Sequence, residues 1–368
     1  MSRQFFLALA NLGHRVPIGI DLVLRQHADA EALLHDGTRL GQVVEETARL
    51  FRSPLGFLPM DLTLEKAGIL RRFGVGEGEA ADFHFTTAPS PAERAEFTRK
   101  LTGFVPTLRL AANLGALQHV ATQTKLLPVG MAIGPFSLTT KLLADPITPV
   151  FLAGTGATAT EEPDVALLEA CLELSLAYVL RYVEVQIAAG ARAIFIAEPA
   201  ANQVYLSPRQ LETGSDILER FVLAPNRRVA EVLATHGVDH LFHCCGEIVD
   251  PILDGFCSLH PVLLSLGSSR RLWEDAARVP RDVVLYGNLP SKQFYSDQLM
   301  PADRVTALAT DLLARMQATG HPFILGTECD TLHVDGCGDT LLRKVQLLLD
   351  APAPSASAPP PLPDKVTQ

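Results

Sequence analysis

The sequence predicts an α/β protein in which eight parallel strands close into a (β/α)8 barrel. Three observations predict this fold. Eight short apolar runs are spread along the chain, and longer segments with apolar residues at helical spacing separate them. Each short run is apolar on both faces, as expected for strands covered by helices. Eight alternations is the number that closes such a barrel, and an open doubly wound sheet is the alternative.

The elements follow one another along the chain. The helical segment after "TEEP" takes Thr160 as its N-cap and ends at Gly190, and another begins at Pro301 and ends at Gly320. The N-terminal stretch "MSRQFFLALANLGHR" has a short apolar patch and predicts a first helix rather than a signal peptide. The expected strands lie at 16–24, 55–62, 126–134, 191–199, 240–246, 261–267, 283–290 and 323–330.

Composition sets the broad class of the protein. The chain has 368 residues, of which 48% are hydrophobic, and a net charge of −10. We expect one barrel domain at 1–350 and a disordered Pro/Ala-rich tail at 351–368. The tail cannot bury enough apolar surface to offset the entropy lost on ordering. No apolar run is long enough for a membrane span, and the acidic balance argues against nucleic acid as a partner. A cytoplasmic location is therefore expected, and the oligomeric state stays open.

Polar residues end most of the expected strands. In a parallel barrel the carboxyl ends of all strands meet at one mouth, where active sites are found. These side chains should therefore converge from segments that lie far apart in the sequence. The residues expected at or beside the mouth are Asp21, Asp61, Glu65, Glu198, His243, Cys245, Asn288, Glu328 and Cys329.

The stretch "HLFHCCGE", which begins at residue 240, carries the strongest chemical signal. Side chains alternate along a strand, so His243 and Cys245 share one face and Cys244 points to the other. A histidine and a cysteine at this spacing are by themselves more often core residues than ligands. Cys329, at the end of the eighth run, supplies a second thiol, and zinc binds His nitrogen and Cys thiolate together. The three residues therefore predict a zinc site.

The remaining cysteines predict no disulfide framework. The sequence holds six cysteines, and in a reducing compartment thiols are core residues, metal ligands or catalytic groups. Cys171 and Cys257 read as core residues on helix faces. Cys337 could replace one of the three predicted metal ligands, but it is a weaker candidate than they are. A bridge between the neighbouring residues Cys244 and Cys245 is not expected, because they point to opposite faces.

These motifs resemble those of the uroporphyrinogen decarboxylase superfamily, a set of distorted (β/α)8 barrels. The resemblance covers roughly residues 3–350 and is closest to zinc-dependent methyltransferases that move a methyl group from a methylated corrinoid protein to a thiol. It also extends to the catalytic module of cobalamin-independent methionine synthase. The resemblance rests on five sequence motifs: "GPF" (134–136), "AEPAAN" (197–202), "HCCG" (243–246), "YGNLP" (286–290) and "GTECD" (326–330).

The resemblance implies roles for single residues. His243, Cys245 and Cys329 fall on the three metal ligands of the family, and Zn²⁺ is the implied cofactor. Glu198 matches the acidic residue before proline after the fourth strand, and Asp61 and Glu65 resemble an acidic pair near the substrate pocket. The implied catalytic residues are Glu198 and Asp61, and the implied substrate-binding residues are Asp21, Glu65, Asn288 and Glu328. The implied partners are a small thiol substrate and a corrinoid protein that carries methylcobalamin.

Two departures from the family pattern leave alternatives open. Methionine synthase has a further glutamate ligand at the end of the sixth strand, where this chain has Gly267. The fourth zinc position would then be taken by water, substrate, Glu328 or another group. The decarboxylase motif after the first strand is reduced here to Arg25 and Gln26, which weakens a decarboxylase acting on a tetrapyrrole-like acid. A non-catalytic metal-binding subunit of a methyl-transfer complex is the third hypothesis.

Overall fold

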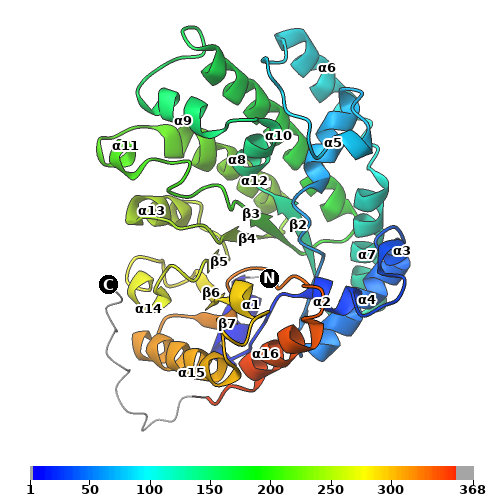
Figure 1. Ribbon diagram of the computed structural model, residues 1–368, viewed down its shortest axis with the longest axis vertical. Helices are drawn as coiled ribbons and strands as arrows, with labels where there is room; N and C mark the ends of the chain where they lie inside the picture. Colours follow the sequence, from blue (N-terminus) through cyan, green and yellow to red (C-terminus); the bar gives the residue numbers. More distant parts are fainter. Residues whose placement is uncertain (1–2, 354–368) are drawn as a thin grey trace.

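Seven parallel strands form one curled sheet at the centre of the molecule (Figure 1). The computed structural model describes residues 3–353. The strands are hydrogen-bonded in sequence order, from β1 to β7, and every neighbouring pair is parallel. The predicted α/β barrel architecture is therefore confirmed in class, with seven strands in place of eight. The strands are β1 Leu55–Phe57, β2 Leu127–Ile133, β3 Ala193–Ala197, β4 Asp239–Cys244, β5 Leu263–Leu266, β6 Val284–Leu289 and β7 Phe323–Thr327.

The first expected strand, at 16–24, is wrong. Residues 20–24 form the short helix α2 (Ile20–Leu24), so Asp21 lies in the first turn of a helix. Residues 15–18 are extended along β7, where Arg15 bridges Leu325 and the Val16 amide donates to the Leu325 carbonyl at 2.8 Å. Short apolar runs do not distinguish a strand from a buried helix by periodicity alone, which explains the error.

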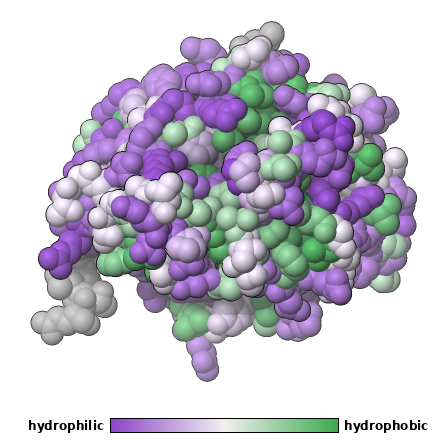
Figure 2. Space-filling view, turned by 90° about the horizontal axis from the view of Figure 1, so that it is seen from above, coloured by the Kyte–Doolittle hydropathy of each residue, from purple (hydrophilic) through white to green (hydrophobic). Residues whose placement is uncertain are grey.

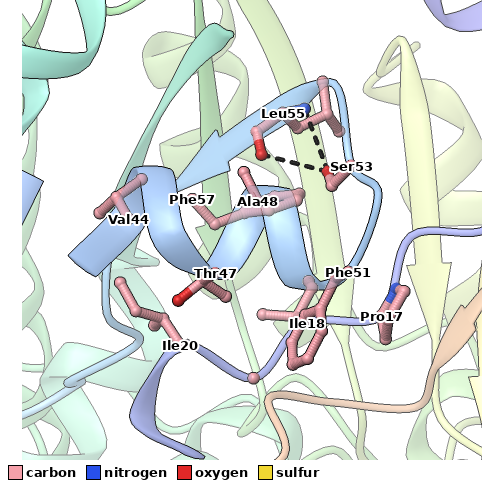
Figure 3. Close-up of a pocket in the computed structure, with 11 residues that line it drawn as sticks. Pro17, Ile18, Ile20, Val44, Thr47, Ala48, Phe51, Ser53, Leu55 and Phe57 are labelled. Atoms are coloured by element: carbon pink, nitrogen blue, oxygen red, sulfur yellow. Dashed lines mark hydrogen bonds between the residues drawn. The ribbon is translucent and has the colours of Figure 1, made fainter. Parts of the chain in front are cut away.

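The extended segment 15–19 stands between β7 and β1, but β1 is not hydrogen-bonded to it. Figure 3 shows the seam between them, which apolar side chains fill, including Ile18, Phe51 and Phe57. A cavity of about 10 Å³ remains there, roughly the space of one water-sized sphere. The Ser53 hydroxyl donates to the Leu55 carbonyl and accepts from the Leu55 amide, at 3.1 and 3.0 Å. The amide and carbonyl of Leu55 are thus satisfied locally, and packing closes the ring.

Side chains from two helices continue the edge of β2 where the short strand β1 has ended. The Gln186 amide group of α10 (Pro163–Ala188) accepts from the Met131 amide at 2.9 Å and donates to the Met131 carbonyl at 3.1 Å. Glu65 of α5 (Leu64–Arg72) accepts from the Ile133 amide at 3.1 Å. A side chain on Gly130 would collide with Gln186 at 2.4 Å, so this glycine is required by the close approach. Gln186 and Glu65 thus provide β2 with hydrogen bonds that a neighbouring strand would otherwise make.

The helices surround the sheet on its outer face (Figure 1). The longest, α10, packs against α5, α6, α8, α9 and α12 and covers the side that leads from β2 to β4. The other helices are α1 Arg3–Asn11, α3 Ala30–Leu33, α4 Gly37–Leu50, α6 Pro91–Leu101, α7 Leu108–Gln123, α8 Pro135–Leu142, α9 Ile147–Gly154, α11 Pro208–Glu212, α12 Ala224–Thr235, α13 Asp250–Ser258, α14 Leu272–Asp275, α15 Ala302–Thr319 and α16 Gly338–Asp350. Single turns lie at Glu77–Glu79 (η1), Glu219–Leu223 (η2, a π-turn) and Ser291–Gln293 (η3).

The predicted helices agree with the structure at most of their ends. The N-terminal helix is α1, and α15 ends at Gly320, whose φ of 62° is the left-handed cap that glycine favours. Helix α10 ends just before Gly190, as expected. Its N-cap is Glu162 rather than Thr160, and the hydroxyl of Thr158 instead donates to Glu161 at 2.7 Å. The predicted cap was therefore two residues too early.

The surface carries hydrophilic residues interspersed with hydrophobic ones, and hydrophobic residues gather in one broad area of the face seen in Figure 2. Within residues 3–353, no helix combines the length and apolarity that crossing a bilayer requires. The expected tail at 351–368 falls outside the described residues from position 354 onward. Ala351 is still buried against the barrel, with 2% of its surface exposed.

Replacing Gln186 with Leu should destabilise the protein, because the buried Met131 amide and carbonyl would lose the side-chain hydrogen bonds that Gln186 gives them. We expect a loss of about 2 kcal/mol in the free energy of unfolding, measured by urea denaturation. Gln118→Leu, on the exposed face of α7, is the control and should change little. Equal stability of the two variants would show that β2 finds other partners.

Candidate metal centre

Three ligand-type side chains converge at the carboxyl end of the sheet. His243 lies in β4, Cys245 follows that strand directly, and Cys329 comes two residues after β7. The His nitrogen and the two Sγ atoms lie within 4.8 Å of one another. The structure therefore brings together the three residues for which the sequence predicted a metal site. Cys245 and Cys329 are partly exposed, so the cluster is reachable from the mouth.

The imidazole of His243 is held in one orientation. Its Nδ1 lies 2.8 Å from the Ser265 hydroxyl, because the register of β4 with β5 pairs these two residues. Its ring stacks on Phe195 with a centroid distance of 5.3 Å. The Nε2 atom is buried and has no hydrogen-bond partner. With Nδ1 engaged, Nε2 is the nitrogen available as a ligand. Sequence reasoning missed Ser265, which only strand register could have identified.

The two thiols are close enough to affect each other's ionisation. The hydrogen bond with Cys329, and then contact with His243, lowers the pKa of Cys245. The same hydrogen bond raises the pKa of Cys329. Cys245 is therefore the thiol that loses its proton more easily. Burial works to lower the pKa of Lys292, but the charges of Cys245 and Glu328 outweigh it and raise that pKa. Lys292 is a cation beside the cluster that sequence reasoning missed.

Gly267 leaves no room for a fourth protein ligand from β5. A Cβ at this position would stand 2.6 Å from the Cys245 carbonyl oxygen and 3.1 Å from the Cys245 Cα. These are backbone atoms, which cannot rotate away. The glycine that departs from the family pattern therefore permits the close approach of the Cys245 backbone. The fourth coordination position is left to a group that does not come from this residue.

Glu328 and Asn288 shape the mouth around the cluster. The Glu328 carboxylate accepts from the Ser268 amide at 3.1 Å and from the Ser268 hydroxyl at 2.7 Å. The Asn288 amide group donates to the carbonyls of Gly267 and Arg270, at 2.7 and 2.9 Å. Both side chains are buried and hold the loop after β5 against its neighbours. Their predicted role as substrate-binding residues stays a prediction.

Glu198 is wholly buried at the start of α8. Its carboxylate accepts from the amides of Phe136 and Ser137, at 3.1 and 2.8 Å, and from the Asn226 side chain at 2.7 Å. Burial raises the pKa of Glu198, while these hydrogen bonds oppose the rise. A side chain on Gly134 would lie about 2.1 Å from the Glu198 carboxyl carbon. The "GPF" and "AEP" motifs thus form one capping unit, and the catalytic role predicted for Glu198 is untested.

The remaining predicted residues lie in two other places. Asp61 accepts from the Thr63 amide at 3.1 Å and pairs with Arg109 at 3.0 Å. Glu65 supports the edge of β2, and burial raises the pKa of its carboxyl to about 8. Asp21 accepts from the His333 amide at 2.8 Å, in the loop after Cys329. Of these three residues, Asp21 is the one that is hydrogen-bonded to the loop that follows the cluster residue Cys329.

Asp330 is a third residue, after Ser265 and Lys292, that the sequence did not assign to the site. Its carboxyl group is 7% exposed, and both oxygens lack a hydrogen-bond partner. Burial, and then the charge of Asp21, raise the pKa of this carboxyl to about 7. Asp330 is the last residue of the "GTECD" motif. Its burial, which the sequence does not reveal, distinguishes it from an ordinary aspartate at the end of a strand.

The cysteine predictions agree with the structure. All six cysteines are free. The Cys244 thiol is buried on the outer face and donates to the Ala201 carbonyl at 3.6 Å, so it points away from Cys245. His240 is also on that face, where burial lowers its pKa to about 4. Neither residue belongs to the cluster.

Comparisons with known proteins identify the family and the fold. The family model of uroporphyrinogen decarboxylase (URO-D) matches residues 57–346. A solved structure, a methyltransferase from Methanosarcina mazei, superposes with a TM-score of 0.65 and 17% sequence identity. The match covers 95% of this chain and 97% of that one, and at this identity it shows a shared fold. No curated protein sequence matches the chain.

Substituting Gly267 with Ala should displace the Cys245 backbone, because the new methyl group has no space beside it. We expect a loss of about 1–3 kcal/mol in unfolding free energy, as for other overpacked sites. Gly103→Ala, where nothing lies within 4 Å of the added atom, is the matched control. Unchanged stability of Gly267→Ala in urea denaturation would mean that the loop after β5 moves freely.

Glu65 should make the stability of the protein depend on pH. The folded state keeps this carboxyl protonated up to about pH 8, whereas an unfolded glutamate ionises near pH 4.3. Folding therefore holds an extra proton between these values, and stability should fall as pH rises, by up to about 1.4 kcal/mol per pH unit. Glu65→Gln should remove this slope, and the exposed Glu79→Gln should keep it. Parallel curves for wild type and Glu65→Gln in urea denaturation at pH 5 to 8 would contradict the prediction.

Proposed function

Because the chain belongs to the uroporphyrinogen decarboxylase family, we propose that it is a zinc-dependent methyltransferase. Its reaction would move a methyl group from a methylated corrinoid, or a similar donor, to a small thiol acceptor at the barrel mouth. The observation that carries this proposal is the donor set of the cluster. One buried, unpartnered imidazole nitrogen and two thiols lie within 4.8 Å of one another.

The donor set fits a catalytic zinc site better than a structural zinc site. Structural zinc sites use four protein ligands, whereas catalytic sites use three and leave one position open. Here the neighbouring position Gly267 can carry no side chain, and Glu328 is engaged with Ser268. His243 is oriented by Ser265, as metal-ligating histidines are oriented by a second hydrogen bond. These features support an open site with His243, Cys245 and Cys329 as its ligands.

Bound zinc would supply a Lewis acid that keeps the acceptor's sulfur as a thiolate at neutral pH. The chain's own residues would do the rest. The two cysteine ligands contribute negative charge, which keeps a neighbouring thiolate nucleophilic. Lys292 lies beside Cys245 and Cys329 and partly balances that charge. The attack forms a sulfur–carbon bond, and the bond between the methyl group and the donor breaks with its electron pair left on the donor.

Recognition of the acceptor falls to the acidic side of the mouth. Asp21 and Asp330 lie near enough for the charge of one to raise the pKa of the other. A cationic group of the acceptor, such as an ammonium, would pair with Asp330, whose oxygens have no hydrogen-bond partner, because Asp21 already pairs with Arg25. Glu198 in this proposal positions α8 rather than reacting, because both of its oxygens already accept hydrogen bonds. A corrinoid protein is the proposed partner that delivers the methyl group.

The decarboxylase alternative would require free cationic groups at the mouth for the substrate's carboxylates. The candidate arginines already have carboxylate partners. Arg25 pairs with Asp21 and Glu31, Arg270 with Asp250 and Asp275, and Arg271 with Glu274. Their charge is therefore neutralised within the chain, which favours the methyltransferase.

Zinc binding tests the proposal directly. X-ray absorption of the zinc-loaded protein should report two sulfur ligands at about 2.3 Å, and a third after homocysteine or coenzyme M is added. Cys245→Ala and Cys329→Ala should each lose most of the metal, because two ligands do not hold zinc. Zinc affinity should fall with decreasing pH, since both thiols must lose their protons.

Cys244→Ala is the matched control, because this thiol points away from the cluster and should leave zinc content unchanged. A methyl transfer assay from methylcobalamin to each thiol then separates an enzyme from an inactive metal-binding subunit. A wild-type protein that purifies without metal and refuses added zinc would end the methyltransferase proposal.

A further inference from the structure

A cavity of about 400 Å³ lies between α5, α8 and the loop that contains η1, away from the cysteine cluster. Its walls combine small apolar residues, such as Ala67 and Ala80, with two lysines and a histidine. Lys66 comes from α5, Lys141 from the last turn of α8, and His84 from the loop. These groups belong to the part of the barrel that follows β1 and β2, whereas the metal centre follows β4 and β7.

Lys66 is a buried cation without an anion. The residue is 6% exposed, and its ammonium group donates to the Ala81 carbonyl at 2.8 Å. The described residues place no carboxylate within ion-pair distance of Lys66 or Lys141. Lys344, which is also buried, has the opposite arrangement, with two carbonyls and the Asp297 carboxylate around it. Buried lysines are normally paired in this second way.

The charges around the cavity favour an incoming anion. Burial, and then the charge of Lys141, lower the pKa of Lys66, so the two ammonium groups repel each other. The charge of Asp82 opposes this and raises the pKa of Lys66, but the described residues include no ion pair between the two, and Glu77 lines the cavity as an exposed residue. Glu65, the residue before Lys66, has a pKa raised to about 8 and so carries little negative charge at neutral pH. An anion between the two lysines would relieve their repulsion.

We infer that this cavity, the Lys66 pocket, binds a small molecule in which an oxyanion is joined to an apolar body. The oxyanion would lie between Lys66 and Lys141, with the His84 ring as a further polar neighbour, while the Thr63 hydroxyl in the wall already donates to Asp61. The apolar body would pack on Ala67 and Ala80. A phosphate monoester and a carboxylate share this chemistry. The site is separate from the metal centre, so its occupancy does not depend on the proposed methyl transfer.

Titration calorimetry at constant ionic strength tests the pocket with three probes: phenyl phosphate, benzoate and inorganic phosphate. Phenyl phosphate should bind more tightly than inorganic phosphate if the apolar wall contributes, and benzoate reports whether a carboxylate suffices. Lys141→Gln removes one charge from a partly exposed position, so folding should persist. It should weaken phenyl phosphate binding at least about tenfold, the effect of losing one charge-assisted contact.

Lys125→Gln, at a lysine outside the pocket, is the matched control and should bind as wild type does. Lys66→Met keeps the apolar stem and should abolish binding. If that variant does not fold, Lys141→Gln alone decides. Bound phenyl phosphate should also protect Lys141, but not Lys125, from acetylation detected by mass spectrometry. Absence of phenyl phosphate binding, or equal binding by Lys141→Gln and Lys125→Gln, would overturn the inference, whatever the zinc content of the protein.

Discussion

The hydrogen-bond register of three neighbouring strands determines the chemistry of the mouth. Ala197, His243 and Ser265 stand side by side on β3, β4 and β5. This register gives His243 a hydroxyl for Nδ1 and leaves Nε2 directed away from it. It also brings the end of β4 so close to the end of β5 that only glycine fits at position 267. A slip of one residue would turn the imidazole to the outer face.

Much of this arrangement could be predicted from the sequence, because it depends on local patterns. Seven of the eight expected strands exist, and alternation within a strand separated Cys245 from Cys244. The match of His243, Cys245 and Cys329 to a known ligand pattern then located the cluster. The first strand was wrong because an apolar run around Gly19 fits a strand or a helix equally well, and only packing against β7 and α4 decides between them.

Other parts could not be predicted, because they depend on contacts between distant segments. The resemblance assigned Glu198 a catalytic role, which stays a prediction. Its position as the cap of α8, with Asn226 as a further donor, depends on segments that only the folded chain brings together. Ser265 and Lys292 carry no motif of their own. Lys66 looks like a surface residue on a helix, and its burial beside Lys141 becomes visible only when α5 and α8 are packed together.

The seam between residues 15–19 and β1 has a consequence for the motions of the molecule. Every other junction around the ring is secured by backbone hydrogen bonds, whereas this one relies on packing. Local opening in proteins follows such weakly bonded boundaries. The Ile18 carbonyl accepts from the Thr331 amide, and Asp21 accepts from the His333 amide. Opening of the N-terminal segment would therefore disturb the loop after Cys329, whereas the β4–β5 side of the mouth keeps its backbone hydrogen bonds. The seam thus adjoins the side of the metal centre that supplies Cys329.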